Sequence, residues 1–207
     1  MTFSGEPAVL GPSGDAFDAA AGTLAILTQG ARAPEISWFA ADGKPARAAM
    51  PPQLIRFLSL SPDETRLLVG YGGDGDNIWV IDLVRGGLAR LTFGKNETAA
   101  IWSPDGKRVL YTCGAQRLCI RLADGSGAEA ILFESKETLR PASWSPDGRS
   151  ILFLGGLPGK WNQYFLPLDG DKKPEPFLID EFDKTSAEFS PDGRWIAYSS
   201  TESGGSH

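Results

Sequence analysis

Four serines, each followed by Pro and Asp, are the first candidates for chemistry in this chain. A nucleophilic serine needs a neighbouring base, normally His, and hydrolases often present it in a Gly-x-Ser-x-Gly turn. The sequence contains no such turn, and its only His is the terminal residue, His207. A residue type that recurs at one structural position is better explained by a turn than by a site needed once. We therefore expect no enzymatic activity from these serines, which are Ser61, Ser103, Ser145 and Ser190.

Two other segments resemble ligand sites. Residues 70–75 satisfy the Gly-x-Gly-x-x-Gly pattern, but the β-rich run 78–83 follows them, where a phosphate site needs a helix N-terminus. Asp74, Asp76 and Asn77 could suggest calcium, yet Ile78 stands where the next oxygen ligand belongs and no closing Glu follows at the required distance. We interpret the segment as a hairpin loop. The acidic run Asp180, Glu181 and Asp183 is expected to be a solvated loop.

The two cysteines, Cys113 and Cys119, flank a turn at residues 114–117 and could face each other across a hairpin. A cross-strand disulfide is one interpretation, if the compartment is oxidising. Two small buried thiols is the interpretation we favour. A structural zinc site needs about four ligands, which two thiols and His207 do not readily supply. We expect neither a metal site nor a cofactor.

The four Ser-Pro-Asp turns are separated by 42, 42 and 45 residues, and residues 17–24 form a decayed earlier copy. A period in the low forties is typical of a propeller with one four-stranded blade per repeat. Pro, Asp and Gly suit a tight turn between a first and a second strand, so Asp63, Asp105, Asp147 and Asp192 are expected to be structural turn residues.

Further strands follow each turn. Third strands are expected at residues 36–40, 78–82, 118–122 and 163–168, and fourth strands around 46, 89–92, 129–133 and 175–179. The last repeat unit, around Ser190, has only two expected strands, at residues 186–189 and 194–199. The sequence therefore predicts an all-β propeller of antiparallel blades, four complete and a fifth partial, with motifs starting near residues 15, 56, 98, 140 and 185.

The run from Trp102 to Gly106, repeated from Trp144, resembles the TolB-like and WD-like β-propeller repeat over essentially the whole chain. Residues 77–83 with 90–93, and 166–170 with Pro174, are more closely similar to the propeller region of bacterial membrane-anchored Ser/Thr protein kinases. No kinase motif is present. The resemblance implies a non-enzymatic scaffold for protein or ligand binding. It also implies that the chain is the sensor part of a bacterial signalling protein and a fragment of a larger propeller. Because TolB-like propellers also precede prolyl-oligopeptidase-type hydrolases, a gating propeller is an alternative. An engineered or truncated propeller with no function of its own is another.

Length, composition and charge indicate the number of domains and argue against some classes of partner. At 207 residues with 42% apolar content, we expect a single domain over residues 1–201, followed by a disordered tail or tag remnant at 202–207. A net charge of −6 argues against nucleic acid as a partner, because phosphate binding depends on Lys and Arg. No apolar run is long enough to span a membrane, and the first ten residues do not resemble an export signal. The kinase resemblance implies that the parent protein could be extracytoplasmic.

Adjacent antiparallel strands reverse direction, so the Ser-Pro-Asp turns lie on one face, and the second-to-third strand loops and inter-blade links on the other. Variable loops on a rigid scaffold often carry recognition, which predicts a protein or peptide partner at the second face. Trp161, next to Lys160 in the longest loop, is our first choice as an exposed anchor. Weaker candidates on the same face are Tyr71, Arg117, Arg140 and Lys184.

The incomplete last blade raises the question of ring closure. The segment Pro7 to Leu10 stands where an outermost strand could pair back with the chain end. A remaining strand edge would be costly or sticky, because its N–H and C=O groups need partners. We expect a strained, roughly five-bladed monomer or self-association through the incomplete blade.

Overall fold

The computed structural model describes residues 16–20, 23–28, 35–40, 44–47, 55–71 and 76–203. Every regular element within these ranges is a β-strand. Within the same ranges there is no helix that could cross a membrane. The all-β fold predicted from the repeat is therefore confirmed.

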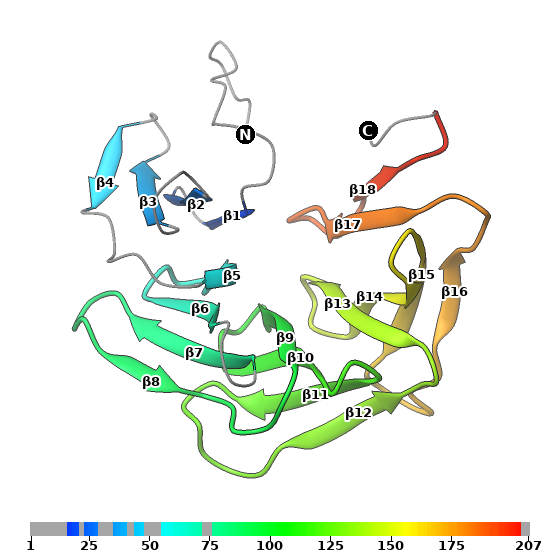
Figure 1. Ribbon diagram of the computed structural model, residues 1–207, viewed down its shortest axis with the longest axis horizontal. Coiled ribbons are helices and arrows are strands. Elements are labelled where there is room, and N and C mark those ends of the chain that lie inside the picture. The colour runs from blue at the N-terminus through cyan, green and yellow to red at the C-terminus, as the bar shows by residue number, and fades with distance from the viewer. Residues whose placement is uncertain are drawn as a thin grey trace.

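The strands form four sheets of four strands and one sheet of two, each an antiparallel meander in chain order. In Figure 1 the sheets follow one another around an arc, with the first strand of each nearest the centre. Four complete blades and a partial fifth are thus confirmed. Blade one is β1 (Ala16–Ala20), β2 (Thr23–Thr28), β3 (Glu35–Ala40) and β4 (Pro45–Arg47); blade two is β5 (Ile55–Leu60), β6 (Arg66–Tyr71), β7 (Asn77–Asp82) and β8 (Leu88–Arg90). Blade three is β9 (Glu97–Trp102), β10 (Arg108–Cys113), β11 (Arg117–Leu122) and β12 (Ala130–Glu134); blade four is β13 (Thr138–Trp144), β14 (Ser150–Leu157), β15 (Lys160–Pro167) and β16 (Glu175–Leu178); the half-blade is β17 (Lys184–Phe189) and β18 (Ile196–Ser200).

Each Ser-Pro-Asp turn carries the same local hydrogen bonds. In the turn between β9 and β10, the Ser103 hydroxyl donates to Asp105 Oδ1 at 2.5 Å and accepts the Arg108 N–H at 2.9 Å. The Lys107 N–H donates to the same Asp105 oxygen at 3.0 Å. Gly106 adopts a positive φ of 65°, which glycine tolerates without strain. The hydroxyl bond to the carboxylate holds the pKa of Asp105 below its ordinary value, as it does for the three other turn carboxylates, Asp63, Asp147 and Asp192.

Neighbouring blades are fastened near these turns by a repeated contact. Trp102 is buried, and its indole N–H donates to the Ser59 carbonyl at 3.0 Å. Arg66 lies 4.6 Å from the Trp102 ring and donates to the Gly106 carbonyl at 2.7 Å. Arg108 lies over the Trp144 ring of the next blade in the same way, at 5.0 Å. Between the blades run apolar clusters that contain most of the buried leucines, isoleucines and valines.

The structure corrects the expectation for the cysteines. Cys113 and Cys119 form a disulfide, with Cα atoms 5.9 Å apart, where the sequence favoured free thiols. They are not directly opposite: Cys113 pairs with Arg117 and Cys119 pairs with Tyr111. The twist of the hairpin brings this diagonal pair within disulfide distance, which spacing along the chain alone did not reveal.

The half-blade ends the described arc. Trp195 stands at the position that Arg66 and Arg108 occupy in their blades, and it is 71% exposed. Among the described strands, no hydrogen-bonded pair joins the first sheet to the last. The predicted closing segment Pro7 to Leu10 lies outside the described residues, as do residues 204–207 of the predicted tail.

Candidate functional site

Two adjoining cavities lie where the innermost strands converge on the loop face, the face that carries the second-to-third strand loops and the links between blades. The first has a volume of about 350 Å³ and is lined by Arg56, Thr98, Arg140 and Trp161, among others. The second, of about 450 Å³, extends along β5, β9, β13 and β17. Both are lined by Arg140, Phe57 and Ala99, so together they form one axial site.

The rim of this axial site is built from one repeated position. Arg56, Thr98 and Thr185 stand second in the innermost strand of their blade, and Arg140 stands third in β13. Arg56, Thr98 and Arg140 are 42 residues apart, which is the interval of the Ser-Pro-Asp turns. Sequence reasoning identified Arg140 but missed the other three, although their spacing carried the signal.

Bulges in the innermost strands shape the wall of the second cavity. The register shifts within the pairing of β5, β9, β13 and β17. At two of these bulges the backbone has positive φ, with 50° at Ala99 and 50° at Ser186. Both residues line the cavity. A bulge leaves a residue out of the ladder, so its backbone N–H and C=O groups are available to a ligand.

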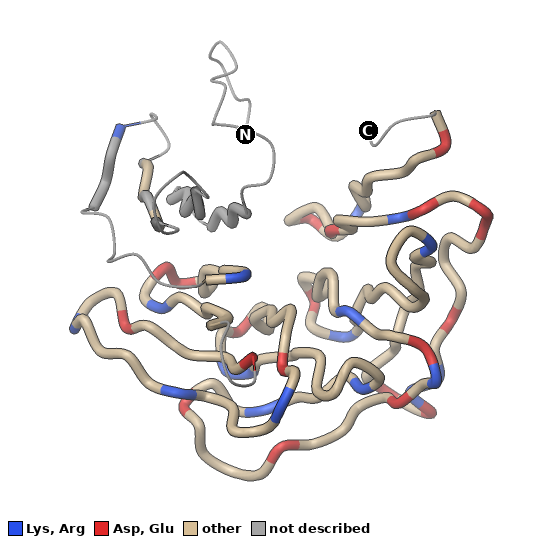
Figure 2. The backbone as a smooth tube through the Cα atoms, viewed as in Figure 1, with Lys and Arg blue, Asp and Glu red and all other residues tan. Residues whose placement is uncertain are grey.

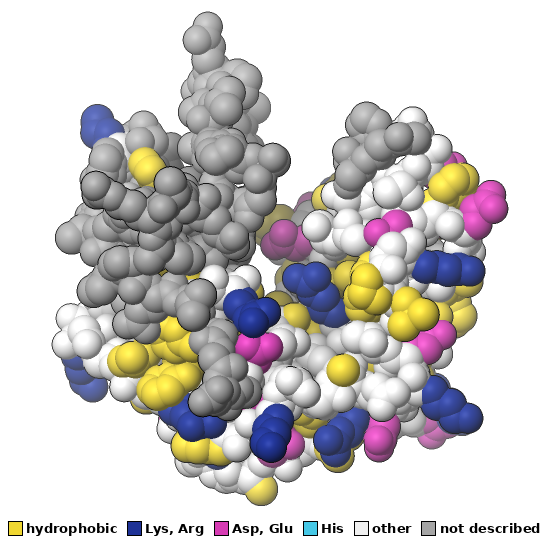
Figure 3. Space-filling model, viewed as in Figure 1, with side chains coloured by type: hydrophobic (Ala, Val, Ile, Leu, Met, Phe, Trp, Pro, Cys, Tyr) yellow, Lys and Arg dark blue, Asp and Glu magenta, His cyan; other side chains and the backbone are white. Residues whose placement is uncertain are grey.

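Two arginines line the axial site of this acidic protein, and they differ in whether they are paired. Arg140 is exposed and forms no ion pair with the described residues, while Arg56 pairs with Asp76 at 3.0 Å. Figure 3 shows dark blue Lys and Arg side chains across the middle of the molecule in that view. Elsewhere Lys and Arg are interspersed with Asp and Glu around the described sheets (Figure 2). A carboxylate entering the site would meet an unpaired guanidinium.

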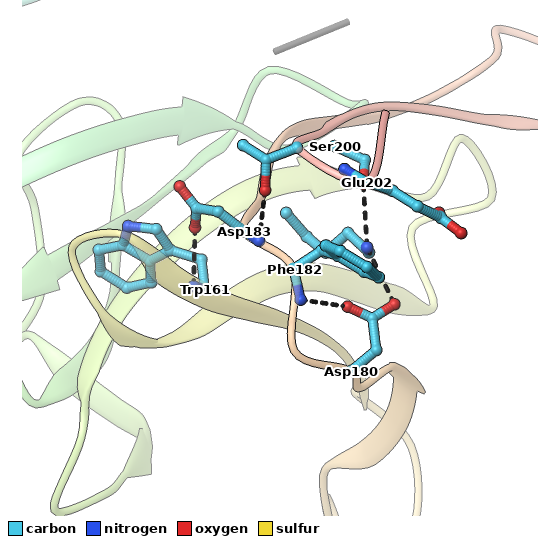
Figure 4. A network of polar contacts seen from close by, with 8 residues as sticks. Trp161, Asp180, Phe182, Asp183, Ser200 and Glu202 are labelled. Carbon is cyan, nitrogen blue, oxygen red and sulfur yellow. Dashed lines mark hydrogen bonds and ion pairs between the residues drawn. The ribbon is translucent and has the colours of Figure 1, made fainter. Parts of the chain in front are cut away.

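Trp161 is held in place from outside the cavity. Its backbone N–H donates to Asp183 Oδ1 at 2.8 Å, and the Asp183 N–H donates to the Thr201 hydroxyl at 3.0 Å. These bonds tie the start of β15 to the segment before β17 and to the end of β18. In Figure 4 the half-buried Trp161 indole points away from this polar network. The network therefore fixes the backbone and leaves the ring to line the first cavity.

Lys184 corrects the prediction of an exposed contact. Its side chain is 1% exposed, and its ammonium group pairs with Asp180 Oδ2 at 2.9 Å and donates to the Ser200 hydroxyl at 3.0 Å. The hydrogen bond from the Lys184 ammonium group is the main cause that lowers the pKa of Asp180. Lys184, the first residue of β17, is thus a structural residue that joins Asp180 before β17 to Ser200 at the end of β18.

The remaining predicted residues lie around the axial site and not in it. Lys160 is exposed beside Trp161, and Arg117 is half-buried at the start of β11. Tyr71 packs edge-on against Trp79, with ring centroids 5.8 Å apart, and burial raises the pKa of its hydroxyl. The structure thus brings two of the six predicted side chains, Trp161 and Arg140, into one cavity.

The turn between β10 and β11 joins the segments that form the first cavity. The Leu139 N–H donates to the Ala115 carbonyl at 2.7 Å, and the Gly114 N–H donates to the Asn96 carbonyl at 3.2 Å. The Thr112 hydroxyl donates to the Leu139 carbonyl at 2.9 Å. This hairpin, which the disulfide closes, therefore holds in place both the segment before blade three, at Asn96, and the start of blade four, at Leu139.

The groups around the axial site suit binding better than bond breaking. Its lining contains two guanidinium groups, several hydroxyls, one indole and one carboxylate, Glu188. No described residue is a histidine, so no described serine has the usual base. A guanidinium, an indole and free backbone groups are typical anchors for an extended peptide.

Comparison with known proteins agrees with this architecture. TolB from Acinetobacter baumannii superposes with a TM-score of 0.74 at 19% identity, covering 89% of this chain and 48% of that one. A putative TolB from Agrobacterium tumefaciens gives a TM-score of 0.75 at 20% identity, covering 90% and 69%. A prolyl endopeptidase structure gives 0.64 at 13% identity, covering 90% of this chain and 32% of that one. At these identities the likeness shows the fold alone.

The chain spans about half the length of the Acinetobacter TolB. No curated protein matches the sequence. The family model described as the TolB beta propeller domain matches residues 56–207, which is well over half of the chain. The repeat, the meander blades and this match lead to one conclusion: the chain belongs to the TolB β-propeller domain family.

Proposed function

We propose that this chain is a non-enzymatic binding propeller whose axial site takes an acidic, extended segment of a protein or peptide. The observation that carries the proposal is Arg140, which is exposed, lacks an ion-pair partner among the described residues and lines both cavities. Trp161 supplies an apolar surface beside it, and the bulges at Ala99 and Ser186 supply backbone groups.

Matched peptides test this proposal. Synthetic peptides rich in Asp and Glu are compared with peptides in which Asn and Gln replace them, and binding is measured by fluorescence anisotropy. The acidic peptides should bind more tightly, and Arg140→Glu should abolish the preference. Arg149→Glu is the matched control, because Arg149 is also exposed but follows a Ser-Pro-Asp turn on the opposite face. Equal binding of both peptide sets, or equal loss in both variants, contradicts the proposal.

The cellular setting is a finer part of the proposal. Residues 1–201 act as one propeller domain in the sensor region of a bacterial signalling protein, as the likeness to kinase propellers implies. The parent propeller is larger than this chain, in keeping with the coverage of the Acinetobacter TolB. Reading the parent gene tests this directly: a kinase segment supports it, and an α/β-hydrolase segment favours the gating alternative.

The likeness to a prolyl endopeptidase keeps that gating propeller as the second candidate. The two functions differ in what the isolated chain does with peptides. A sensor propeller binds them at the axial site, whereas a gate acts only when joined to its hydrolase. In both cases the chain alone should hydrolyse no fluorogenic peptide or ester. Turnover that copurifies with the protein and disappears on one substitution contradicts this.

Self-association is proposed through the half-blade. Among the described strands, β18 pairs with β17 alone, so its outer edge can pair with a strand of a second copy. Light scattering coupled to size exclusion measures the mass. A mass that stays monomeric at high concentration argues against it.

A further inference from the structure

A second group of reactive side chains lies on the face of blade three that packs against blade two. Glu97 comes from β9, Tyr111 and Cys113 from β10, and Cys119 from β11. Glu97 stands opposite Cys113, and Tyr111 stands opposite Cys119. Directly paired residues on antiparallel strands place their side chains on the same face, so these four are neighbours. Tyr111 and both cysteines belong to the apolar cluster shared with Leu68, Ile78 and Val80 of blade two.

Glu129, just before β12, completes a possible ligand set. One of its carboxylate oxygens and the sulfur atoms of Cys113 and Cys119 all lie within 4.8 Å of one another. The Tyr111 hydroxyl donates to Glu129 Oε2 and orients the carboxylate. Both cysteines are buried, whereas Glu129 is exposed, so the cluster meets solvent at Glu129. An ion would have a path of entry there.

Glu97 places a second, buried carboxylate beside this cluster, opposite Cys113. Its side chain is only 4% exposed, and Oε2 has no hydrogen-bond partner among the described residues. A buried carboxylate oxygen without a partner is costly unless a cation compensates it. Arg121 extends over Phe93 at 5.9 Å and donates to the Gly125 carbonyl, and it forms no ion pair with the described acids. Neither Glu97 nor Glu129 forms an ion pair with a described cation, although the Arg121 guanidinium is near enough to favour the ionised form of the neighbouring Tyr111 hydroxyl.

We propose that the reduced protein binds one thiophilic divalent cation, of the Zn²⁺ class, through Cys113, Cys119 and Glu129, with Glu97 balancing the charge. Thiolate and carboxylate are established zinc ligands, and a site with three protein ligands keeps a fourth position for water. The sequence predicted no metal site, because Glu129 joins the cysteines only through the pairing of β11 with β12.

The disulfide and the metal-bound state exclude each other. A dithiol reductant supplies two electrons and two protons, the S–S bond breaks, and the reductant leaves as a disulfide. Metal binding then forms two metal–sulfur bonds and one metal–oxygen bond and releases the two thiol protons. The site is therefore available only under reducing conditions.

Co²⁺ is the probe for the test, because its thiolate complexes absorb visible and near-ultraviolet light. The full chain is reduced with a phosphine, which becomes the phosphine oxide with oxygen from water, and is titrated with Co²⁺ without air. We expect a thiolate charge-transfer band that saturates at one equivalent, disappears on adding Zn²⁺ and is missing in the oxidised protein. A reduced protein that shows no such band overturns the proposal.

Variants identify the ligands. Glu129→Gln should weaken Co²⁺ binding at least about tenfold. Glu134→Gln, at an exposed acid at the end of β12, should leave it unchanged. Circular dichroism checks that each variant is folded. Equal affinity in the two variants shows that Glu129 is not a ligand and overturns the assigned set, and Cys119→Ser should remove the band altogether.

Discussion

The two faces of this propeller are built in opposite ways. On the face of the Ser-Pro-Asp turns, the bonds of Asp105 and Ser103 are closed within five residues, and the same pattern recurs in the three other Ser-Pro-Asp turns. On the loop face, the Trp161 backbone is held by Asp183 and the Asn96 link by Gly114. Local repeated bonds keep the blades alike, whereas contacts between distant segments let each loop differ. Substitutions in the Ser-Pro-Asp turns should therefore each lower the free energy of unfolding by a small, similar amount. Substitutions on the loop face should mainly change binding.

Lys184→Ala should have the largest effect on the free energy of unfolding. It is an exception on the loop face, where other substitutions should mainly affect binding. The change removes a fully buried side chain, its ion pair with Asp180 and its bond to Ser200. We expect the free energy of unfolding to fall by about 3 kcal/mol, near the low end for breaking a buried pair because Asp180 is partly exposed. Chemical denaturation measures it, with the exposed Lys160→Ala as control. An equal, small effect of both changes would mean that Lys184 is not structural.

Replacing both cysteines by serine should come next. The disulfide closes a short loop with a sequence separation of 6, and such a loop contributes about 2 kcal/mol in the chain-entropy picture. Because the same hairpin sets Ala115 and the Asn96 link, amide hydrogen exchange should also speed up at residues 114–116. Unchanged amide exchange in the double variant would show that the disulfide does not hold the hairpin residues that line the first cavity.

Trp161→Ala tests the loop face as a binding surface. The substitution keeps the backbone bond to Asp183 and removes only the indole, so stability should change little. Affinity for the acidic peptides should fall by about tenfold, which is about 1.4 kcal/mol. Trp195→Ala is the matched control, since Trp195 is 71% exposed and lines neither axial cavity. If Trp195→Ala weakens binding more, the partner lies on the half-blade.

Asp105→Ala should give the smallest change, a loss of no more than about 1 kcal/mol, because the group is exposed and its bonds are screened by water. The contribution also depends on pH. The pKa of Asp105 is lowered from 3.8, so its stabilisation is complete above that value and is lost as the pH falls through the lowered pKa. Unfolding curves of wild type and variant should therefore converge in acid, and a gap that persists there contradicts the role of the ionised carboxylate.

The repeat made most of the fold predictable. Each Ser-Pro-Asp turn combines three residues with one compatible backbone conformation, so the turn and its flanking strands follow from local chemistry. The segment 70–75 was likewise predicted as a hairpin, and Tyr71 does pair with Asn77 across antiparallel strands. Local signals suffice wherever the partners are close in the sequence.

The site was predicted only in part. Arg140 and Trp161 were chosen by residue type and loop position, and the structure adds Arg56 and Thr98 to the same cavity. Lys184 was misjudged because nothing near it in the sequence shows that Asp180 and Ser200 enclose its ammonium group. The disulfide was not favoured because its diagonal register depends on the twist of the hairpin.

The sequence by itself determined the all-β repeat, the number of blades and the division into a constant and a variable face. These properties rest on backbone preferences and on a spacing that repeats along the chain. Only the tertiary structure decided that Arg56, Arg140 and Trp161 surround one cavity and that Glu129 approaches the two cysteines. The reason is physical: ring curvature and strand pairing place these side chains together, and neither is encoded by the neighbours of any one residue.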